Sequence, residues 1–175
     1  MERSFEILAE QFRPMLLTYL TALVRNRSLA EDLTQETLAA AYRSLDTFSQ
    51  EGNFGSWLRG IARNKVRESA RAAMRRPLIV DSRIIEGMEE VYGIFDNPHS
   101  SAGSWDERLD LIHGCVGKLS SRLQQAVMLV YGQGHSLLEA AQQLNSSFEA
   151  VGQRLSRARV LIKKCVTLQM ARARQ

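Results

Sequence analysis

The sequence predicts an all-α protein made of two small helical domains joined by a flexible acidic linker. Apolar residues recur every three or four positions over most of the chain, the spacing that buries one face of a helix. No stretch has a convincing strand pattern, and the 175 residues include only 7% aromatics and three prolines. We expect domains at residues 1–76 and 105–175 and the linker at 77–104. The second domain is predicted to be a four-helix helix-turn-helix.

The charge of the chain is arranged in three blocks. Residues 59–76 hold seven basic residues and one acid, and residues 151–175 hold seven basic residues and no acid. Between them, residues 77–112 hold eight acids against two arginines. Two basic blocks separated by an acidic one indicate two contacts with a polyanion such as DNA. The alternative is that these are charged helix faces that only keep the protein in solution.

The first domain is predicted to begin with a helix that starts near Ser4 and is kinked or broken at Pro14. A second helix should follow, with Ser28 and Glu31 forming a capping box at its start. Within the linker, a short helix is possible over residues 82–94. The second predicted helix of the first domain has a polar side, which alone means little because soluble helices normally have one. This side holds Asp32, Gln35 and Glu36.

Residues 46–76 form a polar loop and then a helix, in which aromatic residues lie beside arginines and lysines. Phe48, Phe54 and Trp57 occur in and just after the loop. Aromatic rings stack on unpaired bases while cations hold the backbone, so this mixture suits single-stranded nucleic acid. The alternative is that Phe54 and Trp57 are ordinary core residues.

Residues 136–164 are predicted to form two helices separated by a short polar break. Ser136 with Glu139, and Ser146 with Glu149, each fit the S-x-x-E pattern of a capping box. The second helix is apolar on one side and basic on the rest, as a helix that enters the major groove would be. An ordinary helical hairpin with a solvated second helix fits the same pattern, so the hairpin alone does not decide between them.

No catalytic, metal or cofactor site is predicted, and we expect neither an enzyme nor a small-molecule substrate. His113 and Cys115 are too few for a zinc site without partners. Cys115 and Cys165 are isolated in the sequence and are expected to form no disulfide framework, Cys165 being a small core residue. No run of about 18 apolar residues predicts a membrane span, and the N-terminus does not fit a secretory signal. We expect a cytoplasmic protein.

Three motifs in series resemble the extracytoplasmic-function group of bacterial RNA polymerase sigma factors. LAEDLTQETLAAAY at residues 29–42 is similar to the D-L-x-Q-E-x-F helix of that group. The W-L-x-x-I-A-x-N segment of the group is similar to residues 48–64, F-x(5)-F-x-x-WLRGIARN. The terminal hairpin of the group is similar to residues 136–159, SLLEAAQQLNSSFEAVGQRLSRAR. The motifs occur in the family's order and span nearly the whole chain. The resemblance implies that core RNA polymerase and promoter DNA are partners, with an anti-sigma factor as a possible third.

The resemblance also implies functions for individual residues. The polymerase clamp would be bound by Asp32, Gln35 and Glu36. The −10 element would be held and melted by Phe48, Trp57, Arg59, Arg63, Asn64, Arg67 and Arg71. The −35 element would be contacted by Glu149, Gln153, Arg154, Arg157, Arg159 and Lys163. Arg159 and Lys163 are better placed for phosphates than for bases, and the neighbouring Leu155 and Ala158 should face the core.

Two positions depart from the family pattern in the terminal hairpin. Ala150 stands where the family usually has threonine, and Gly152 stands at a variable position that is often basic. Glycine in a helix costs about 1 kcal/mol relative to alanine, so −35 recognition could differ from that of other members. Two alternatives therefore stay open: a dimeric helix-turn-helix regulator of duplex DNA that does not recruit polymerase, and a sigma-like decoy without promoter function.

Overall fold

A computed structural model describes residues 2–49, 52–72, 81–96 and 103–172, with side chains from Phe5 onward. Within these ranges the chain forms α-helices and short 3-10 or π segments, and no strand. It divides into two compact units, Met1–Ile79 and Val80–Gln175. The prediction of an all-α protein with two domains is therefore confirmed. None of the helices in the described ranges has the length and hydropathy needed to cross a bilayer.

Unit 1 is a bundle of three helices that pack against one another in every pairing. They are α1 (Glu2–Val24), α2 (Arg27–Arg43) and α3 (Phe54–Ala72), and the short 3-10 helix η1 (Leu45–Thr47) follows α2. Apolar side chains that are no more than 2% exposed fill the space between the helices. They include Met15, Leu16, Leu20, Leu23, Leu33 and Leu58.

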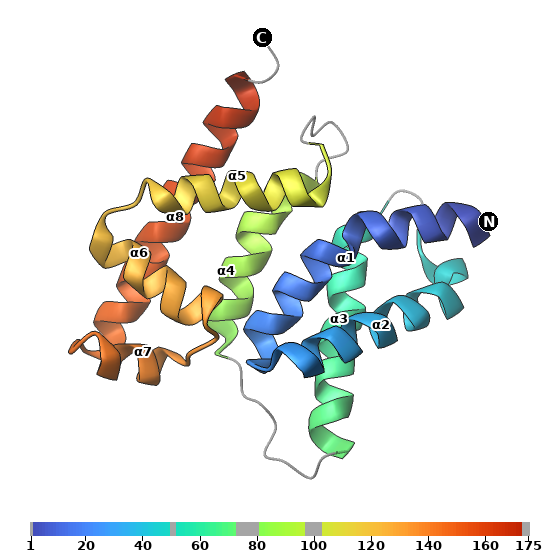
Figure 1. Cartoon of the computed structure of the whole chain (residues 1–175), viewed down its shortest axis with the longest axis horizontal. Coiled ribbons are helices and arrows are strands. Elements are labelled where there is room, and N and C mark those ends of the chain that lie inside the picture. The colour runs from blue at the N-terminus through green and yellow to red at the C-terminus, as the bar shows by residue number, and fades with distance from the viewer. Residues whose placement is uncertain (1, 50–51, 73–80, 97–102, 173–175) are drawn as a thin grey trace. The chain divides into compact units, whose positions relative to one another are not determined.

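Two local predictions for unit 1 can be compared with the structure. Pro14 lies inside α1, and the helix changes direction part-way along without ending (Figure 1). The predicted capping box of Ser28 and Glu31 is wrong, because α2 begins at Arg27 and Asn26 caps it. The Asn26 side chain accepts a hydrogen bond of 3.0 Å from the Leu29 amide. Asparagine satisfies the open amides of a helix start as well as serine does.

Unit 2 is organised around its last helix, α8 (Phe148–Arg172), which contacts every other α-helix of the unit. The others are α4 (Ser82–Tyr92), α5 (Trp105–Gly117), α6 (Ser121–Val127) and α7 (Leu137–Gln143), with the 3-10 helix η2 (Gly93–Asp96) and the π segment η3 (Met128–Gly132). Helices α5 to α8 are the four that the sequence predicts. Helix α4 is an addition to them.

Helix α4 lies within residues 77–104, where the sequence predicts a linker. Its existence agrees with the short helix expected over residues 82–94. Its role differs, because Ile84, Met88 and Val91 are buried and the Tyr92 ring packs edge-on against Trp105 at 5.5 Å. The segment therefore contributes to the core of unit 2. Residues 97–102 of the predicted linker lie outside the described residues.

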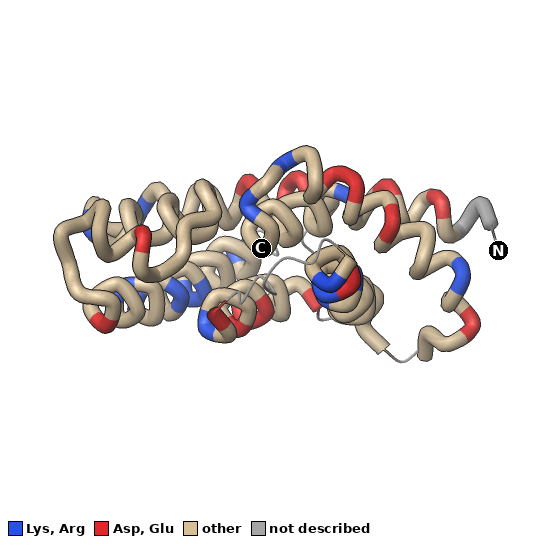
Figure 2. Tube along the Cα trace, turned by 90° about the horizontal axis from the view of Figure 1, so that it is seen from below, with Lys and Arg blue, Asp and Glu red and all other residues tan. Residues whose placement is uncertain are grey.

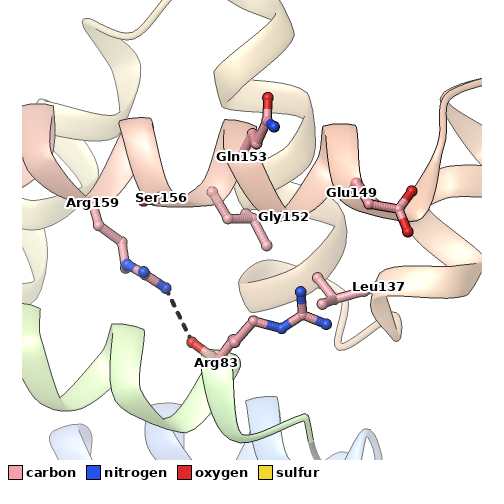
Figure 3. A pocket seen from close by; sticks show the side chains of 8 residues that line it. Arg83, Leu137, Glu149, Gly152, Gln153, Ser156 and Arg159 are labelled. Carbon is pink, nitrogen blue, oxygen red and sulfur yellow. Dashed lines mark hydrogen bonds between the residues drawn. The ribbon is translucent and has the colours of Figure 1, made fainter.

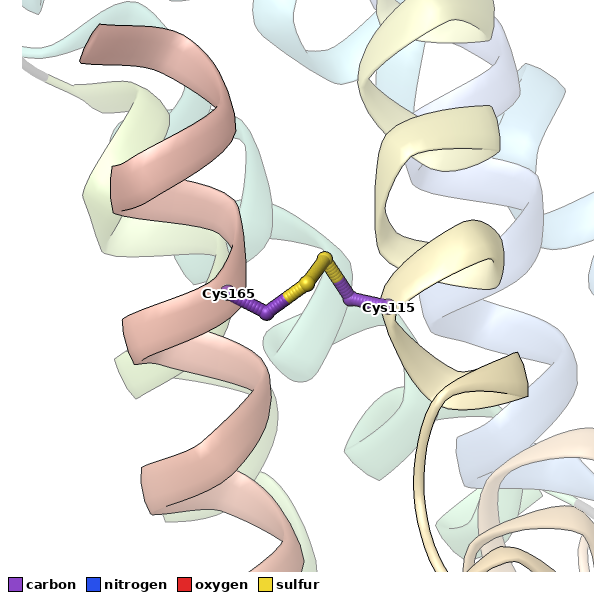
Figure 4. Close-up of a disulfide and its surroundings, with 2 residues drawn as sticks. All are labelled: Cys115 and Cys165. Carbon is purple, nitrogen blue, oxygen red and sulfur yellow. A yellow bond between two sulfur atoms is a disulfide. The ribbon is translucent and has the colours of Figure 1, made fainter. Parts of the chain in front are cut away.

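A disulfide joins α5 to α8, so the expectation that Cys115 and Cys165 are isolated is wrong (Figure 4). The two cysteines are 50 residues apart in the sequence, yet their Cα atoms are 5.8 Å apart because α5 packs against α8. That separation is within the range a disulfide needs. Sequence distance alone did not reveal that the two helices are neighbours.

Candidate polymerase and nucleic-acid surfaces

The three residues predicted to bind polymerase lie together on the exposed side of α2. Asp32, Gln35 and Glu36 are all exposed, and their spacing of three and four places them on one helix face. The opposite face of α2 is buried and includes Leu33 and Leu38. The helix thus presents two carboxylates and one amide to solvent.

The aromatic residues near the start of α3 form one cluster inside unit 1. The ring of Phe48 lies 5.4 Å from Phe54 and 5.1 Å from Trp57, measured between centroids. Phe54 also contacts Phe12 of α1 at 5.2 Å. The cluster accounts for these residues as packing, which was the alternative interpretation. Phe48 and Trp57 are nevertheless only half-buried, so part of each ring remains accessible.

The polar residues of α3 are divided between the interior and the surface. Arg59 is only 1% exposed, so it offers no surface to a ligand in this structure. Arg63 is half-buried and donates a hydrogen bond of 3.1 Å to the Tyr19 hydroxyl. Asn64, Arg67 and Arg71 are exposed at spacings of three and four, which places them on one face.

That exposed face of α3 is connected by its own hydrogen bonds. Arg67 donates to the Asn64 side-chain oxygen at 3.2 Å, and Arg71 donates to the Arg67 carbonyl at 3.4 Å. Next to it, the Lys65 ammonium donates to Glu68 and lowers the pKa of that carboxyl group. The face is therefore a short strip of two guanidinium groups and one amide.

Helices α7 and α8 form a helix-turn-helix with a tight turn between them. Asn145 in the turn has φ of 46°, the left-handed conformation that asparagine tolerates better than most residues. Ser136 and Glu139 form the predicted capping box of α7. The second predicted box is wrong, because α8 starts at Phe148 and Ser147 accepts from the Ala150 amide at 3.1 Å. The hydroxyl of Ser146 instead donates to the Leu144 carbonyl.

Helix α8 has one buried side and one outward side. The predicted inward residues Leu155 and Ala158 are buried, together with Val151, Ile162 and Val166. Glu149, Gln153 and Arg157 are exposed. Arg154 is half-buried and donates a hydrogen bond of 2.8 Å to the Ser146 hydroxyl, so it tightens the turn.

The remaining two predicted −35 residues, Arg159 and Lys163, contact α4. Arg159 donates to the Arg83 carbonyl at 3.1 Å, and Lys163 lies 3.7 Å from the Glu90 carboxylate. Sequence analysis missed this packing. The signal was present, because Ile84, Met88 and Val91 have helical spacing in the segment that was predicted to be a linker.

A pocket of about 370 Å³ lies where α4 meets the N-terminal half of α8 (Figure 3). The Arg83 and Arg159 side chains extend into it, and Gly152 leaves one wall without a side chain. The Asp81 carboxylate accepts two bonds from the Arg83 guanidinium, at 2.9 and 2.6 Å. This pairing lowers the pKa of Asp81 and raises the pKa of Arg83.

Tyr131 of η3 lies next to the same contact. Burial raises the pKa of its hydroxyl, and the positive charge of Arg159 opposes that rise. Within the described part of the chain, no three His, Cys, Asp or Glu side chains gather closely enough to hold a metal ion.

The protein has two helical units. Unit 1 carries an exposed polar face on α2 and a basic strip on α3, and unit 2 ends in a helix-turn-helix. These features are typical of a DNA-binding protein with two domains. Two family models match the chain in that order. Sigma-70 region 2 matches residues 8–76, and Sigma-70 region 4 matches residues 109–162. Together the two matches cover most of the chain.

The chain is also similar to individual sigma factors and to one solved structure. RNA polymerase sigma factor CnrH of Cupriavidus metallidurans is 30% identical over 131 residues, which are 74% of this chain and 69% of CnrH. ECF RNA polymerase sigma factor BldN of Streptomyces coelicolor is 28% identical over 149 residues, 85% of this chain and 54% of BldN. A solved structure, sigma factor RpoE of Bartonella quintana with the anti-sigma factor NepR, matches with a TM-score of 0.40 and 24% identity. That match covers 94% of this chain and 98% of the other.

The chain belongs to the extracytoplasmic-function group of RNA polymerase sigma factors. It is a sigma factor that binds core RNA polymerase and directs promoter recognition and transcription initiation. The matches to both regions do not favour the alternative of a helix-turn-helix regulator that works without polymerase.

Proposed function

We propose that three separate helix faces divide the work of this sigma factor. The face of α2 binds the polymerase clamp, the strip on α3 with the neighbouring aromatic rings binds the −10 element, and α8 binds the −35 element. One observation carries the proposal: on each of these helices at least half of the predicted residues are exposed and only Arg59 is buried, whereas an apolar stripe of the same helix is buried. Arg59 is the exception and is left out of the −10 surface.

For the clamp, the proposed contacts are Asp32, Gln35 and Glu36. Two carboxylates and an amide within about one turn can accept several charge-assisted hydrogen bonds from a basic partner surface. Their exposure on one face supports this assignment, because no rearrangement of unit 1 is needed to reach them.

For the −10 element, the proposal retains Phe48, Trp57 and the exposed strip. The accessible parts of the two rings can stack on unpaired bases, while Arg67 and Arg71 neutralise phosphates. Asn64 can donate to or accept from a base edge. Arg63 is a weaker candidate, because its guanidinium is already bonded to Tyr19.

For the −35 element, Gln153 and Arg157 on the outward side of α8 are the proposed base contacts, and Arg159 and Lys163 the phosphate contacts. Glu149 can accept from a cytosine amino group. Arg154 is expected to act mainly through the turn, since it is bonded to Ser146.

We also propose that the chain acts by binding, not as an enzyme, and that it works in the cytoplasm, where polymerase and the chromosome are. An anti-sigma factor is a further proposed partner, on the ground of family membership. Affinity purification from native cells tests this last point. Recovery of polymerase subunits alone would remove the anti-sigma factor from the proposal.

The proposed function is tested by run-off transcription with purified core polymerase on promoters of the cognate genome. Initiation that depends on the added chain is the expected result. A decoy without promoter function would bind polymerase and start no transcript. A regulator of duplex DNA would bind DNA and leave core polymerase unaffected.

The clamp assignment makes a separate prediction. Replacing both carboxylates (Asp32→Ala with Glu36→Ala) should weaken binding to core polymerase by at least about tenfold, because hydrogen bonds to charged groups are worth about 1.5–3 kcal/mol each. Surface plasmon resonance with immobilised polymerase measures the change.

A matched control removes two acids at the same spacing from another exposed face of unit 1. Glu6→Ala with Glu10→Ala on α1 makes the same change in net charge. Equal weakening by both double variants would show a general effect of charge and would contradict the assignment of α2.

A further inference from the structure

The side chain of Arg83, in the first turn of α4, lies beside the first two turns of α8 (Figure 3). Its guanidinium carbon is 4.6 Å from the ring centroid of Phe148, the first residue of α8. A Cβ atom at Gly152 would lie 3.4 Å from the Nη1 atom of Arg83. Both distances place a positive charge from α4 next to the end of α8 that is proposed to bind the −35 element.

Two contacts hold this guanidinium group in one orientation. The Asp81 carboxylate accepts from Nε and Nη2 of Arg83, at 2.9 and 2.6 Å, and the Phe148 ring supports the cation from one side. The third nitrogen, Nη1, also carries N–H donors and has no hydrogen-bond partner among the described residues. Because the Arg83 side chain is 46% exposed, these donors can reach an acceptor outside the protein.

Gly152 lies at the edge of the outward side of α8. Each residue turns a helix by about 100°, so Gly152 is about 60° around the axis from Glu149 and about 40° from Ser156, which are both exposed. When a helix lies in the major groove, the middle of its outward side faces the base edges and its flanks face the phosphates of the groove walls. The Nη1 donors of Arg83 therefore lie where a phosphate would pass.

The first part of α8 has few cations of its own. Residues 148–156 contain one, the half-buried Arg154, whereas residues 157–172 contain five basic residues (Figure 2). Duplex DNA carries one negative charge about every 1.7 Å along its axis, so both halves of a DNA-reading helix meet phosphates. Gly152 occupies a position from which α8 itself could supply a cation, and Arg83 supplies one there from α4.

We propose that Arg83 is a further contact of the −35 surface, and that Nη1 donates to a DNA phosphate beside the N-terminal half of α8. The proposal rests on the assignment of α8 as the DNA-reading helix. Helix α4 stays packed on α8 in the complex, because it leaves the outward side of α8 exposed. It lies outside both ranges that the family models match, residues 8–76 and 109–162, so the family match does not assign this contact.

The test uses the full chain and short DNA duplexes of several sequences at low salt, with fluorescence anisotropy as the measurement. Arg83→Ala should weaken binding roughly tenfold on every sequence, as expected for one lost hydrogen bond to a charged group. The slope of log affinity against log salt should become shallower by about 0.9, the value for one phosphate contact.

Three outcomes of this measurement would overturn the proposal. The first is an unchanged affinity and slope for Arg83→Ala. The second is a loss confined to some sequences, which would make Arg83 a base contact. The third is a wild-type chain that binds no duplex at low salt, because α8 would then not act as a reader of duplex DNA in the full chain.

The matched control is Arg172→Ala in the last turn of α8. Arg172 is exposed and lies 20 residues beyond Gly152, about 30 Å further along the helix. This variant removes the same charge and should keep the wild-type salt slope. An equal loss of slope in both variants would show a general effect of net charge and would contradict the contact.

A second variant separates a lost charge from lost packing of α4. Gly152→Lys returns a cation to the same edge of α8, so the double variant with Arg83→Ala should recover the wild-type slope. In the wild-type background the same lysine should add little, because the phosphate beside it is already neutralised. Failure of the rescue, or an equal gain in both backgrounds, would overturn the proposal.

These outcomes are separate from those of run-off transcription. A chain that starts no transcript can still lose slope when Arg83 is replaced. A sigma factor that starts transcripts while Arg83→Ala keeps the wild-type slope lacks this contact.

Discussion

The two units engage their proposed DNA-binding residues in different ways. In unit 1, Asn64, Arg67 and Arg71 bond only to one another in the contacts described above, all within α3. In unit 2, Arg159 bonds to a carbonyl 76 residues earlier in the chain. Unit 1 therefore displays its strip ready for use, whereas unit 2 presents only the outward side of α8. The difference teaches that some proposed contact residues are held by other elements of their unit, as Arg159 is, while others are exposed on a single helix.

The largest expected difference between the units is their response to a reducing agent. The disulfide closes a loop of about 50 residues in unit 2, which in the chain-entropy model is worth about 4 kcal/mol. Reduction should lower the free energy of unfolding of unit 2 by up to that amount and leave unit 1 unchanged. Each unit contains one tryptophan, Trp57 or Trp105, so urea titrations of single-tryptophan variants follow each unit separately.

The control for this measurement is the double variant Cys115→Ala with Cys165→Ala, which should not respond to reductant. An unfolding midpoint of unit 2 that is the same with and without reductant would contradict a stabilising disulfide. If reductant also changed the unfolding midpoint reported by Trp57, the two units would not differ in their response to reduction.

A smaller effect, on discrimination between DNA sequences, is expected from substitutions on the outward side of α8, which is exposed. Arg157→Ala should reduce discrimination between −35 sequences by about 1–3 kcal/mol if the guanidinium makes a bidentate base contact. Competition binding with variant duplexes measures this. Lys164 is exposed on the same helix, and Lys164→Ala should weaken binding to all duplex sequences equally. Equal losses on all sequences for Arg157→Ala as well would make it a phosphate contact.

The smallest effect concerns acid and the start of α4. Asp81 caps α4 and pairs with Arg83, which lowers its pKa below the ordinary value of 3.8. A lowered pKa in the folded state adds stability above the unfolded value, and this is lost as pH falls through the folded value. Amide exchange in the first turn of α4 should therefore rise only at pH values below 3.8. Asp81→Asn should remove this pH dependence, and an unchanged profile would contradict the pairing.

Much of the local structure could be predicted from the sequence, because it depends on neighbours along one helix. The buried stripe of α8, including Leu155 and Ala158, follows from helical spacing alone. The start of α8 was placed wrongly because Asn145 adopts a left-handed conformation and Ser147, not Ser146, accepts from the first turn. The conformation of Asn145 in the turn therefore determines that Ser147, and not Ser146, caps α8.

Contacts between distant segments could not be predicted in the same way. Periodicity indicates which side of a helix is buried but not what covers it, so the packing of α4 on α8 and the bond between Cys115 and Cys165 were both missed. Arg59 was assigned to the −10 contact from the family resemblance and from the cations that lie beside aromatic residues, yet it is 1% exposed in unit 1. The assignment of residues to polymerase and promoter contacts stays a prediction.

Helix α8 is both the central element of unit 2 and its proposed reader of DNA, over one uninterrupted span of 25 residues. Each residue inserted in an α-helix rotates everything beyond it by about 100°. An insertion or deletion near the middle of α8 would therefore turn Gln153 and Arg157 away from their present direction relative to Ile162 and Val166. If α8 reads DNA as proposed, substitutions on its outward side can change promoter preference while the buried side stays in place, whereas a change in helix length disturbs both.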